Sequence, residues 1–251
     1  MGNEEIKVKS LVKALKILDC FTEKPSWGVT EISERLGLYK SNVHDILTTL
    51  KAMDYLEKEE DINRYKLGMK VFALSRAMGD SFSIIKIALP YMQELANVTN
   101  ERVYLAVPHD NEVIYLEATY PAESVNLMRS ILGERAQMYC TGLGKAMLAH
   151  YSNAELEQYL NRSFTAYTES SITDKEALRK ELEITRQRGY AIDNMEHEFG
   201  VKCVALPIFD SNRKLTAALS VSGLSTHFTE EKIKEWAILM KQYIAKIENR
   251  L

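Results

Sequence analysis

The feature that most constrains this 251-residue chain is a pair of helical patterns separated by a single glycine. Val29, Ile32 and Leu36 recur at helical spacing, and Gly37 follows them as a residue that often ends a helix. After a tight turn comes a second helical stripe, at Val43, Ile46, Leu47, Leu50 and Met53. Two helices joined by so short a turn are typical of a helix-turn-helix.

The segments on either side complete this pattern. Apolar residues recur at helical spacing through residues 8–22, ahead of the motif. Behind it, residues 55–58 and 64–67 flank a polar tip, which predicts a β-hairpin. Helix, helix, turn, helix and hairpin is the order of a winged helix-turn-helix, which we assign to residues 1–67. We expect Thr30 to be the N-cap of the short second helix.

The polar face of the helix that begins near Lys40 indicates double-stranded DNA as a partner. In this fold, side chains from the N-terminal half of that helix reach base edges in the major groove. The candidates for base contacts are Ser41, Asn42, His44 and Asp45, and those for phosphate contacts are Lys40, Thr48 and Thr49, with Lys58 and Arg64 on the hairpin. The alternative is the solvated face of an ordinary helix, but the preceding short helix and the following hairpin favour DNA.

The composition of the chain neither supports nor opposes DNA binding, but it argues against a membrane protein, a secreted protein and a structural zinc site. The formal charge is −3, and residues 1–80 hold 13 basic and 13 acidic side chains, so the bulk charge does not indicate nucleic acid. No stretch approaches the roughly 20 apolar residues of a membrane span, and residues 1–9 do not resemble a signal peptide. We therefore expect a cytoplasmic protein without a membrane partner. Cys20, Cys140 and Cys203 are widely spaced, which predicts free thiols and no structural zinc.

The remainder of the chain alternates helical and strand patterns. Residues 68–80 are predicted to form a linker helix, and residues 81–251 a second, α/β domain with a mixed sheet. A helical pattern continues to about residue 97, where Pro90 kinks or restarts it, and strand patterns occupy residues 103–107, 113–117, 124–129, 190–193, 202–208 and 215–222. Further helices begin near Gly142, at a capping box from Ser152 to Glu155, at a second from Thr173 to Glu176, and near residue 229.

Several segments together resemble the IclR-type family of bacterial transcriptional regulators. In the first domain these are VTEISERLGL at 29–38, KSNVH at 40–44 and YKLG at 65–68. In the second they are CTGLGKA at 140–146, GYAID at 189–193, GVKCVALPIF at 200–209 and SVSG at 220–223. Two features depart from the family pattern: Asp45 stands where such regulators often have arginine, and the predicted wing is acidic at its tip.

The resemblance implies an α+β protein in which the winged helix-turn-helix is joined by a helix to a mixed α/β, GAF-like ligand-binding domain, 81–251. Family members sense small acids, so residues 81–251 are expected to bind an organic-acid effector and to form oligomers. The expected contacts are Met128, Thr141, Gly142, Leu143, Asp193, Val201, Cys203, Ser220 and Ser222. Met128 and Val201, with Val125, would form the apolar wall.

The chemistry of these residues agrees with an acid-binding pocket. Main-chain N–H groups at 141–143, which open a helix, attract an anion. Ser220 and Ser222 lie two apart on a predicted strand and so share a face. The alternatives are that the glycines only form turns, that Cys203 only packs in the core, and that the serines are exposed.

Other chemistries have less support. The segment around Gly142 lacks the residues of a phosphate loop or of a complete dinucleotide fingerprint, and no zinc-protease motif follows His197. A nucleophile formed by Cys203, His197 and Asp193, or a metal held by Asp193, Cys203 and a histidine, remains an alternative. We expect no catalytic residue, no cofactor and no bound metal.

The sequence therefore predicts a regulator, most simply a repressor, whose affinity for a palindromic operator is controlled by a small organic acid. One recognition helix contacts few base pairs, so we expect a homodimer or homotetramer that mates through the apolar helices of residues 68–97. One rival is a small-molecule sensor or enzyme that uses its helix-turn-helix as an interaction module. A second is an architectural DNA binder whose second domain binds nothing.

Overall fold

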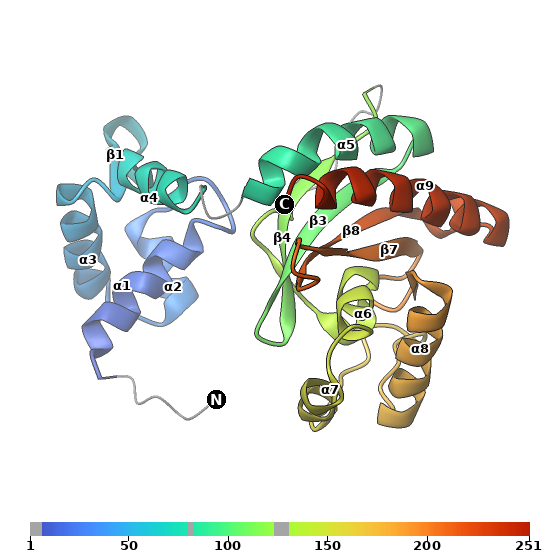
Figure 1. Cartoon of the computed structure of the whole chain (residues 1–251). Coiled ribbons are helices and arrows are strands. Elements are labelled where there is room, and N and C mark those ends of the chain that lie inside the picture. Colours follow the sequence, from blue (N-terminus) through green and yellow to red (C-terminus); the bar gives the residue numbers. More distant parts are fainter. Residues whose placement is uncertain (1–6, 80–82, 123–130) are drawn as a thin grey trace. The chain divides into compact units, whose positions relative to one another are not determined.

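The computed structural model describes residues 7–79, 83–122 and 131–251 (Figure 1). The chain divides into two compact units, Met1–Phe82 and Ser83–Leu251. The boundary between the two compact units therefore follows the helix predicted at residues 68–80. No helix among the described residues is long and apolar enough to cross a membrane.

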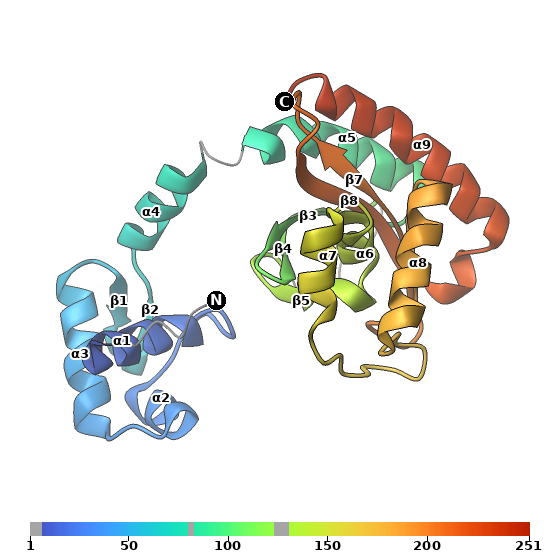
Figure 2. The same ribbon diagram turned by 60° about the horizontal axis from the view of Figure 1, so that its bottom comes forward.

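The first unit has the order of elements that the sequence predicted. It contains α1 (Lys9–Cys20), α2 (Val29–Leu36), α3 (Lys40–Ala52), β1 (Leu56–Glu59), the 3-10 turn η1 (Glu60–Ile62), β2 (Arg64–Leu67) and α4 (Met69–Gly79). Ile17, Ile32, Val43 and Leu47 are fully buried between the three helices. Trp27 bridges Tyr65 of the hairpin, which ties the wing to the helices. Figure 2 shows α4 extending from the end of β2.

The start of α2 differs from the prediction. The N-cap is Gly28 rather than Thr30, and the carboxylate of Glu31 accepts a 2.8 Å hydrogen bond from the Gly28 N–H. Glu31 also accepts from Lys24 at 2.7 Å, and these hydrogen bonds hold the pKa of its carboxyl at about 2. The other end is as predicted, because Gly37 caps the helix in the left-handed conformation, with φ of 64°.

The second unit is built on a six-stranded sheet in the order β5-β4-β3-β8-β7-β6. The strands are β3 (Arg102–His109), β4 (Glu112–Thr119), β5 (Arg135–Gln137), β6 (Ala191–Asn194), β7 (Val201–Phe209) and β8 (Leu215–Leu224). The expectation of a mixed sheet was wrong, because every pairing among the described residues is antiparallel. The strand predicted at 124–129 lies outside the described residues.

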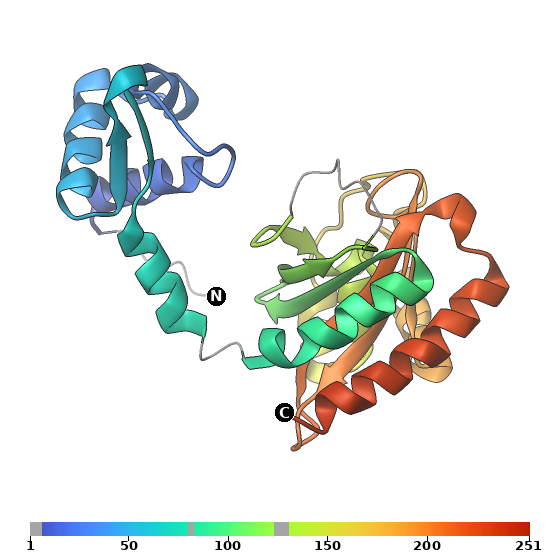
Figure 3. The ribbon, with the colours of Figure 1, turned by 90° about the horizontal axis from the view of Figure 1, so that it is seen from above.

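Helices cover both faces of this sheet. On one face lie α5 (Ser83–Thr99), which continues through Pro90, and α9 (Glu230–Glu248), and Figure 3 shows these two helices side by side. On the other face lie η2 (Met138–Cys140), α6 (Gly142–Leu148), α7 (Asn153–Leu160) and α8 (Lys175–Arg188), while η3 (Ser225–His227) precedes α9. The Ser152–Glu155 capping box is confirmed, whereas α8 is capped by Asp174 and not by Thr173.

Side-chain alternation on the strands separates two cores. Val103, Leu105, Val204 and Leu219 face α5 and α9. Ala106, Ala191, Ala205 and Ala218 face α6, and these short side chains let the helix approach the sheet closely. Beyond the N-terminal end of α6, the same face of the sheet carries larger polar side chains, and these line a cavity.

Candidate functional sites

The proposed recognition helix, α3, presents a polar face to solvent. Val43 and Leu47 are fully buried, so the opposite face is turned outward. The candidates on this helix are all at least partly exposed: Lys40, Ser41, Asn42, His44, Asp45, Thr48 and Thr49. His44 Nδ1 lies 3.7 Å from Asp45 Oδ1, and the Thr49 hydroxyl donates to the Asp45 carbonyl at 2.8 Å. The surface that the sequence indicated is therefore accessible, and its residues share one face.

The two candidates on the wing, Lys58 and Arg64, form ion pairs within the first unit. Arg64 donates to Ser26 O at 2.8 Å and lies 2.8 Å from Glu31 Oε2, so its guanidinium ties β2 to the start of α2. Lys58 Nζ lies 3.1 Å from Glu60 Oε2. Both candidate cations of the wing are therefore paired with carboxylates of the first unit in this structure.

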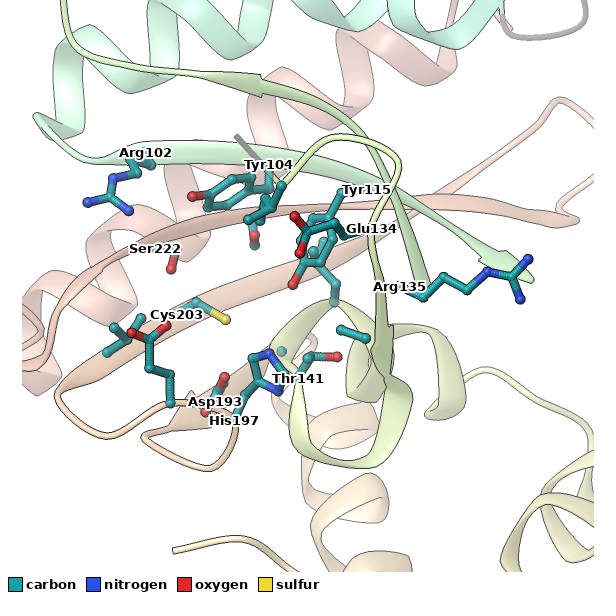
Figure 4. Close-up of a pocket in the computed structure, with 17 residues that line it drawn as sticks. Arg102, Tyr104, Tyr115, Glu134, Arg135, Thr141, Asp193, His197, Cys203 and Ser222 are labelled. Carbon is teal, nitrogen blue, oxygen red and sulfur yellow. The ribbon is translucent and has the colours of Figure 1, made fainter. Parts of the chain in front are cut away.

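A cavity of about 410 Å³ opens on the α6 side of the second unit (Figure 4). Eight of the predicted effector contacts line it: Thr141, Gly142, Leu143, Asp193, Val201, Cys203, Ser220 and Ser222. The ninth, Met128, lies outside the described residues, as does Val125. Residues from β6, β7, β8 and the start of α6 thus meet at one place, although they are up to about 80 positions apart in the sequence.

Strand register explains why these residues converge. Asp193 pairs with Cys203, Cys203 pairs with Ser222, and Ser222 pairs with Arg102. Directly paired residues on antiparallel strands lie on the same face. The four side chains therefore form one row across β6, β7, β8 and β3, and all four line the cavity. Ser220 lies in the next row on the same face, paired with Tyr104.

The glycines at the start of α6 have a packing role. The hydroxyl of Thr141 caps the helix by accepting from the Gly144 N–H at 3.1 Å. A Cβ atom at Gly142 would overlap Cys203 Sγ, and one at Gly144 would overlap the main chain of Met138. The lack of side chains is thus what brings the helix end against the cavity wall.

Asp193 is the most perturbed acid of the cavity. Its side chain is only 6% exposed, and burial raises the pKa of the carboxyl to about 7. A hydrogen bond of 2.7 Å from the Glu196 N–H to Oδ1 opposes this rise. A carboxyl whose pKa lies near neutrality accepts from a hydroxyl when ionised and donates when protonated. Perturbed groups in a cavity are typical of functional sites.

A buried ion pair supports the wall behind Asp193. Lys145 of α6 is fully buried, and its Nζ lies 2.5 Å from Glu196 Oε1 and 3.6 Å from Glu181 Oε1. Burial raises the pKa of Glu196, and the charge of Lys145 opposes that shift. Neither the sequence patterns nor the resemblance singled out this pair, because a lysine in a helix is normally a surface residue.

The arrangement disfavours the nucleophile alternative. Burial raises the pKa of the Cys203 thiol, and the nearby Asp193 raises it further, whereas a nucleophile needs the thiolate. His197 Nδ1 lies 3.7 Å from Cys140 Sγ, and burial lowers the pKa of that imidazole. In the described part of the chain, no three His, Cys, Asp or Glu side chains are gathered so as to hold a metal ion.

Several residues of these sites were missed by sequence reasoning. Arg102, Tyr104, Tyr115 and His197 also line the cavity, and Figure 4 shows them around the predicted residues. Arg102 and Tyr104 alternate on one strand, a signal that becomes informative only when the partner strand is known. In the first unit, Tyr39 is the residue immediately before α3. It is 81% exposed, which is unusual for an aromatic residue.

Comparison with known proteins places this geometry in a family. The model of the IclR helix-turn-helix domain matches residues 10–60, and that of the bacterial transcriptional regulator IclR C-terminal domain matches residues 76–249. The regulator KdgR of Escherichia coli (strain K12) is 31% identical over 245 residues, covering 97% of this chain and 93% of the relative. The transcriptional repressor IclR of the same strain is 30% identical over 240 residues, covering 93% and 86%.

Solved structures match nearly the whole chain. The IclR of Thermotoga maritima is 34% identical with a TM-score of 0.81, covering 96% of this chain and 98% of that one. An IclR homologue of Microbacterium hydrocarbonoxydans complexed with 4-hydroxybenzoate is 25% identical with a TM-score of 0.82, again covering 96% and 98%. The fold and sites thus define a transcriptional regulator with a helix-turn-helix DNA-binding domain, and its relatives are named as regulators rather than as enzymes. The chain belongs to the IclR family.

Proposed function

We propose that this regulator is a repressor whose affinity for its operator is controlled by a small organic acid bound in the cavity. The observation that carries the proposal is the row of polar side chains from Asp193 to Arg102, which lines a cavity of about 410 Å³. Such a volume lies within the range of small-molecule pockets. That a relative is named as a transcriptional repressor supports repression, rather than activation, of the regulated gene.

The effector carboxylate is assigned to the space between the main-chain N–H groups at 141–143 and the hydroxyls of Ser220 and Ser222. A carboxylate that leaves water needs several donors, because an unpaired buried charge is costly. Asp193, when ionised, accepts from a hydroxyl or hydrated carbonyl of the effector. Leu143 and Val201, with Met128 outside the described residues, supply apolar contacts. The bound 4-hydroxybenzoate of the Microbacterium homologue supports an acid as the class of ligand.

On the DNA side, we assign base contacts to Ser41, Asn42, His44 and Asp45 and phosphate contacts to Lys40, Thr48 and Thr49. We assign to Lys58 a contact with the DNA backbone, which it makes when its ion pair with Glu60 opens. Arg64 is assigned the role of holding β2 against the start of α2 through Glu31. The exposed Tyr39 joins the candidates, because a tyrosine hydroxyl at the start of a recognition helix donates to phosphate.

We propose that DNA binding occurs as a homodimer or homotetramer on a palindromic operator. The apolar residues Met69, Phe72 and Leu74 of α4 are exposed, which supports this helix as part of the mating surface. In α5 most apolar side chains are instead buried against the sheet, so residues 83–97 contribute less than the sequence suggested. Light scattering at micromolar concentration should detect a dimer or larger species, and a monomer would contradict the proposal.

We assign one role to each of the three predicted segments of the chain. Residues 1–67 are assigned to DNA binding, 68–80 to the connecting helix, and 81–251 to effector binding and oligomerisation. Because the target is chromosomal DNA, we expect the protein to act in the cytoplasm.

A gel-shift assay against the promoter next to the protein's own gene tests the proposed function against its rivals. An acid that binds the cavity should change the fraction of promoter bound, whereas random DNA should bind weakly with or without it. If the helix-turn-helix is an interaction module, promoter DNA will not shift. If the protein is an architectural DNA binder, DNA will shift and no acid will alter the shift.

A further inference from the structure

One tyrosine that the sequence did not indicate, Tyr115, lines the cavity with its ring against that of Tyr104. Tyr115 lies on β4 and pairs with Ala106 of β3, which in turn pairs with Ala218 of β8. Both alanines face α6, so their short side chains leave room for the tyrosine ring on this face of the sheet. The two rings meet edge to face, with centroids 5.5 Å apart and planes at 70°. Figure 4 shows Tyr115 between Tyr104 and Thr141.

The hydroxyl of Tyr115 makes no hydrogen bond to any residue that the structure describes. Two other tyrosines of the unit are paired, because the Tyr139 hydroxyl donates to the Thr165 carbonyl at 2.6 Å and the Tyr151 hydroxyl donates to Met138 Sδ at 3.7 Å. A tyrosine hydroxyl inside a protein normally has such a partner, since an unpaired polar group has lost its hydrogen bonds to water. The Tyr115 hydroxyl is instead open to the cavity, so a ligand there can supply the missing partner.

At neutral pH this hydroxyl is protonated and donates. Burial raises the pKa of Tyr115, and the nearby Cys203, Tyr104 and Asp193 raise it further. A neutral phenol donates one hydrogen bond, whereas an ionised carboxylate such as that of Asp193 only accepts. Tyr115 therefore offers the ligand a donor, and an oxygen atom of the ligand is a suitable acceptor.

The proposed carboxylate site does not need Tyr115. An ionised carboxylate accepts about four hydrogen bonds. The main-chain N–H groups at 141–143 and the hydroxyls of Ser220 and Ser222 supply enough donors for these. Both serines lie on β8, whereas Tyr115 lies on β4, and β3 separates the two strands. Tyr115 therefore approaches the ligand from another part of the wall and is available for a different oxygen.

An acid without a second oxygen would leave the Tyr115 hydroxyl unpaired. Such an acid displaces water from this hydroxyl when it enters the cavity and replaces none of its hydrogen bonds. Ile131, Ala136 and Leu143, which belong to the same apolar cluster as Tyr115, have no side-chain acceptor. A site built to bind a ligand oxygen discriminates strongly against an analogue that lacks it, because the polar group of the site is then left without a partner.

We propose that Tyr115 is a specificity-determining residue, whose hydroxyl donates to a hydroxyl or carbonyl oxygen of the effector. The cavity then prefers hydroxy acids and oxo acids to the corresponding unsubstituted acids. This inference rests on the proposed function, because it concerns the same cavity. The difference between a paired and an unpaired hydroxyl corresponds to about 5- to 100-fold in affinity.

Binding of matched sets of acids to the full-length protein tests the inference: propionate with lactate and pyruvate, butyrate with β-hydroxybutyrate and acetoacetate, and benzoate with 4-hydroxybenzoate. By isothermal titration calorimetry, an oxygenated acid of at least one set should bind about fivefold or more tightly than its unsubstituted acid. Tyr115→Phe, which removes only the hydroxyl, should reduce that acid's affinity about 5- to 100-fold and should not weaken the unsubstituted acid. Tyr151→Phe, which lies outside the cavity lining, is the matched control and should change neither.

Circular dichroism of Tyr115→Phe should match that of the wild type, because the ring that packs on Tyr104 is kept. The inference is overturned if no oxygenated acid binds the wild-type protein more tightly than its unsubstituted acid, if the preference survives in Tyr115→Phe, or if that variant weakens both kinds of acid equally. Gel shifts with the same acids separate this inference from the proposed function. If unsubstituted acids alter promoter binding and the added oxygen gains nothing, only this inference fails; if neither kind alters it, both fail.

Discussion

The main-chain N–H of Glu196 donates a 2.7 Å hydrogen bond to Oδ1 of Asp193, while the side chain of Glu196 pairs with the buried Lys145. Through this residue, the acid that lines the cavity is joined to an ion pair beneath α6. The proposed effector contact therefore rests on a charged cluster that is buried, and both the stability of the domain and its response to pH depend on that cluster.

Asp193 should make the protein less stable as pH rises toward neutrality. Its pKa is about 7 in the folded protein and near 4 when unfolded, so between those values the folded state holds the extra proton. This stabilisation is complete below about pH 4 and is lost as pH rises through about 7, with a slope of up to about 1.4 kcal/mol per pH unit. Urea unfolding from pH 4 to 8 should show that Asp193→Asn removes the slope. An identical slope in the variant would contradict the assigned pKa.

Lys145→Met should destabilise the second unit strongly at alkaline pH. Removing one partner of a buried pair leaves Glu196 charged in a dry environment, which costs about 3–5 kcal/mol. The loss should shrink at acidic pH, because Glu196, whose pKa burial raises, then becomes neutral. Chemical unfolding at pH 5 and pH 8 measures the difference. The exposed Lys214→Met is the control and should change stability by less than about 0.5 kcal/mol. A pH-independent loss would count against the pairing.

Gly142→Ala should destabilise the protein by about 1–3 kcal/mol, because the added methyl group overlaps Cys203 Sγ. The double variant Gly142→Ala/Cys203→Ala removes the sulfur and should recover much of this loss. Thermal unfolding of the four proteins of the cycle gives the coupling free energy. Additive effects would mean that the glycine is required for another reason.

Lys40→Ala should weaken binding to all DNA sequences and reduce the salt slope of log Kd by about one unit, as expected for one lost phosphate contact. Asn42→Ala and His44→Ala should instead narrow the difference in affinity between operator and random DNA. Fluorescence anisotropy with both duplexes at several salt concentrations distinguishes these effects. The division of α3 into base and phosphate contacts is wrong if the three variants behave alike.

Periodic patterns located most elements to within a few residues. The stripe from Val43 to Leu50 defined α3, and alternation defined β3, β7 and β8. The short β5, at Arg135–Gln137, holds too few residues to show a period and was missed. The caps at Gly28 and Asp174 were also missed, because main-chain conformation, and not residue type alone, selects the capping residue.

The residues of the candidate sites could be predicted only as far as their partners in the folded structure were known. The resemblance indicated Asp193, Cys203 and Ser222 together, but only the register of β3 on β8 brings Arg102 into their row. In the same way, only the fold shows that the wing candidate Arg64 pairs with Glu31, 33 positions earlier in the chain. A local pattern contains no information about such partners.

Control of DNA binding by the cavity can be measured in one titration. Promoter DNA is held with wild-type protein, Ser222→Ala or Asp193→Ala, and the acid that shifts wild-type binding most is added stepwise. Each variant should need about 5- to 100-fold more acid to reach the half-point, because one contact worth about 1–3 kcal/mol is lost. Promoter affinity without acid should stay within about twofold of wild type. If the half-points are unchanged in both variants, the effector does not bind at Ser222 and Asp193 and its site lies elsewhere.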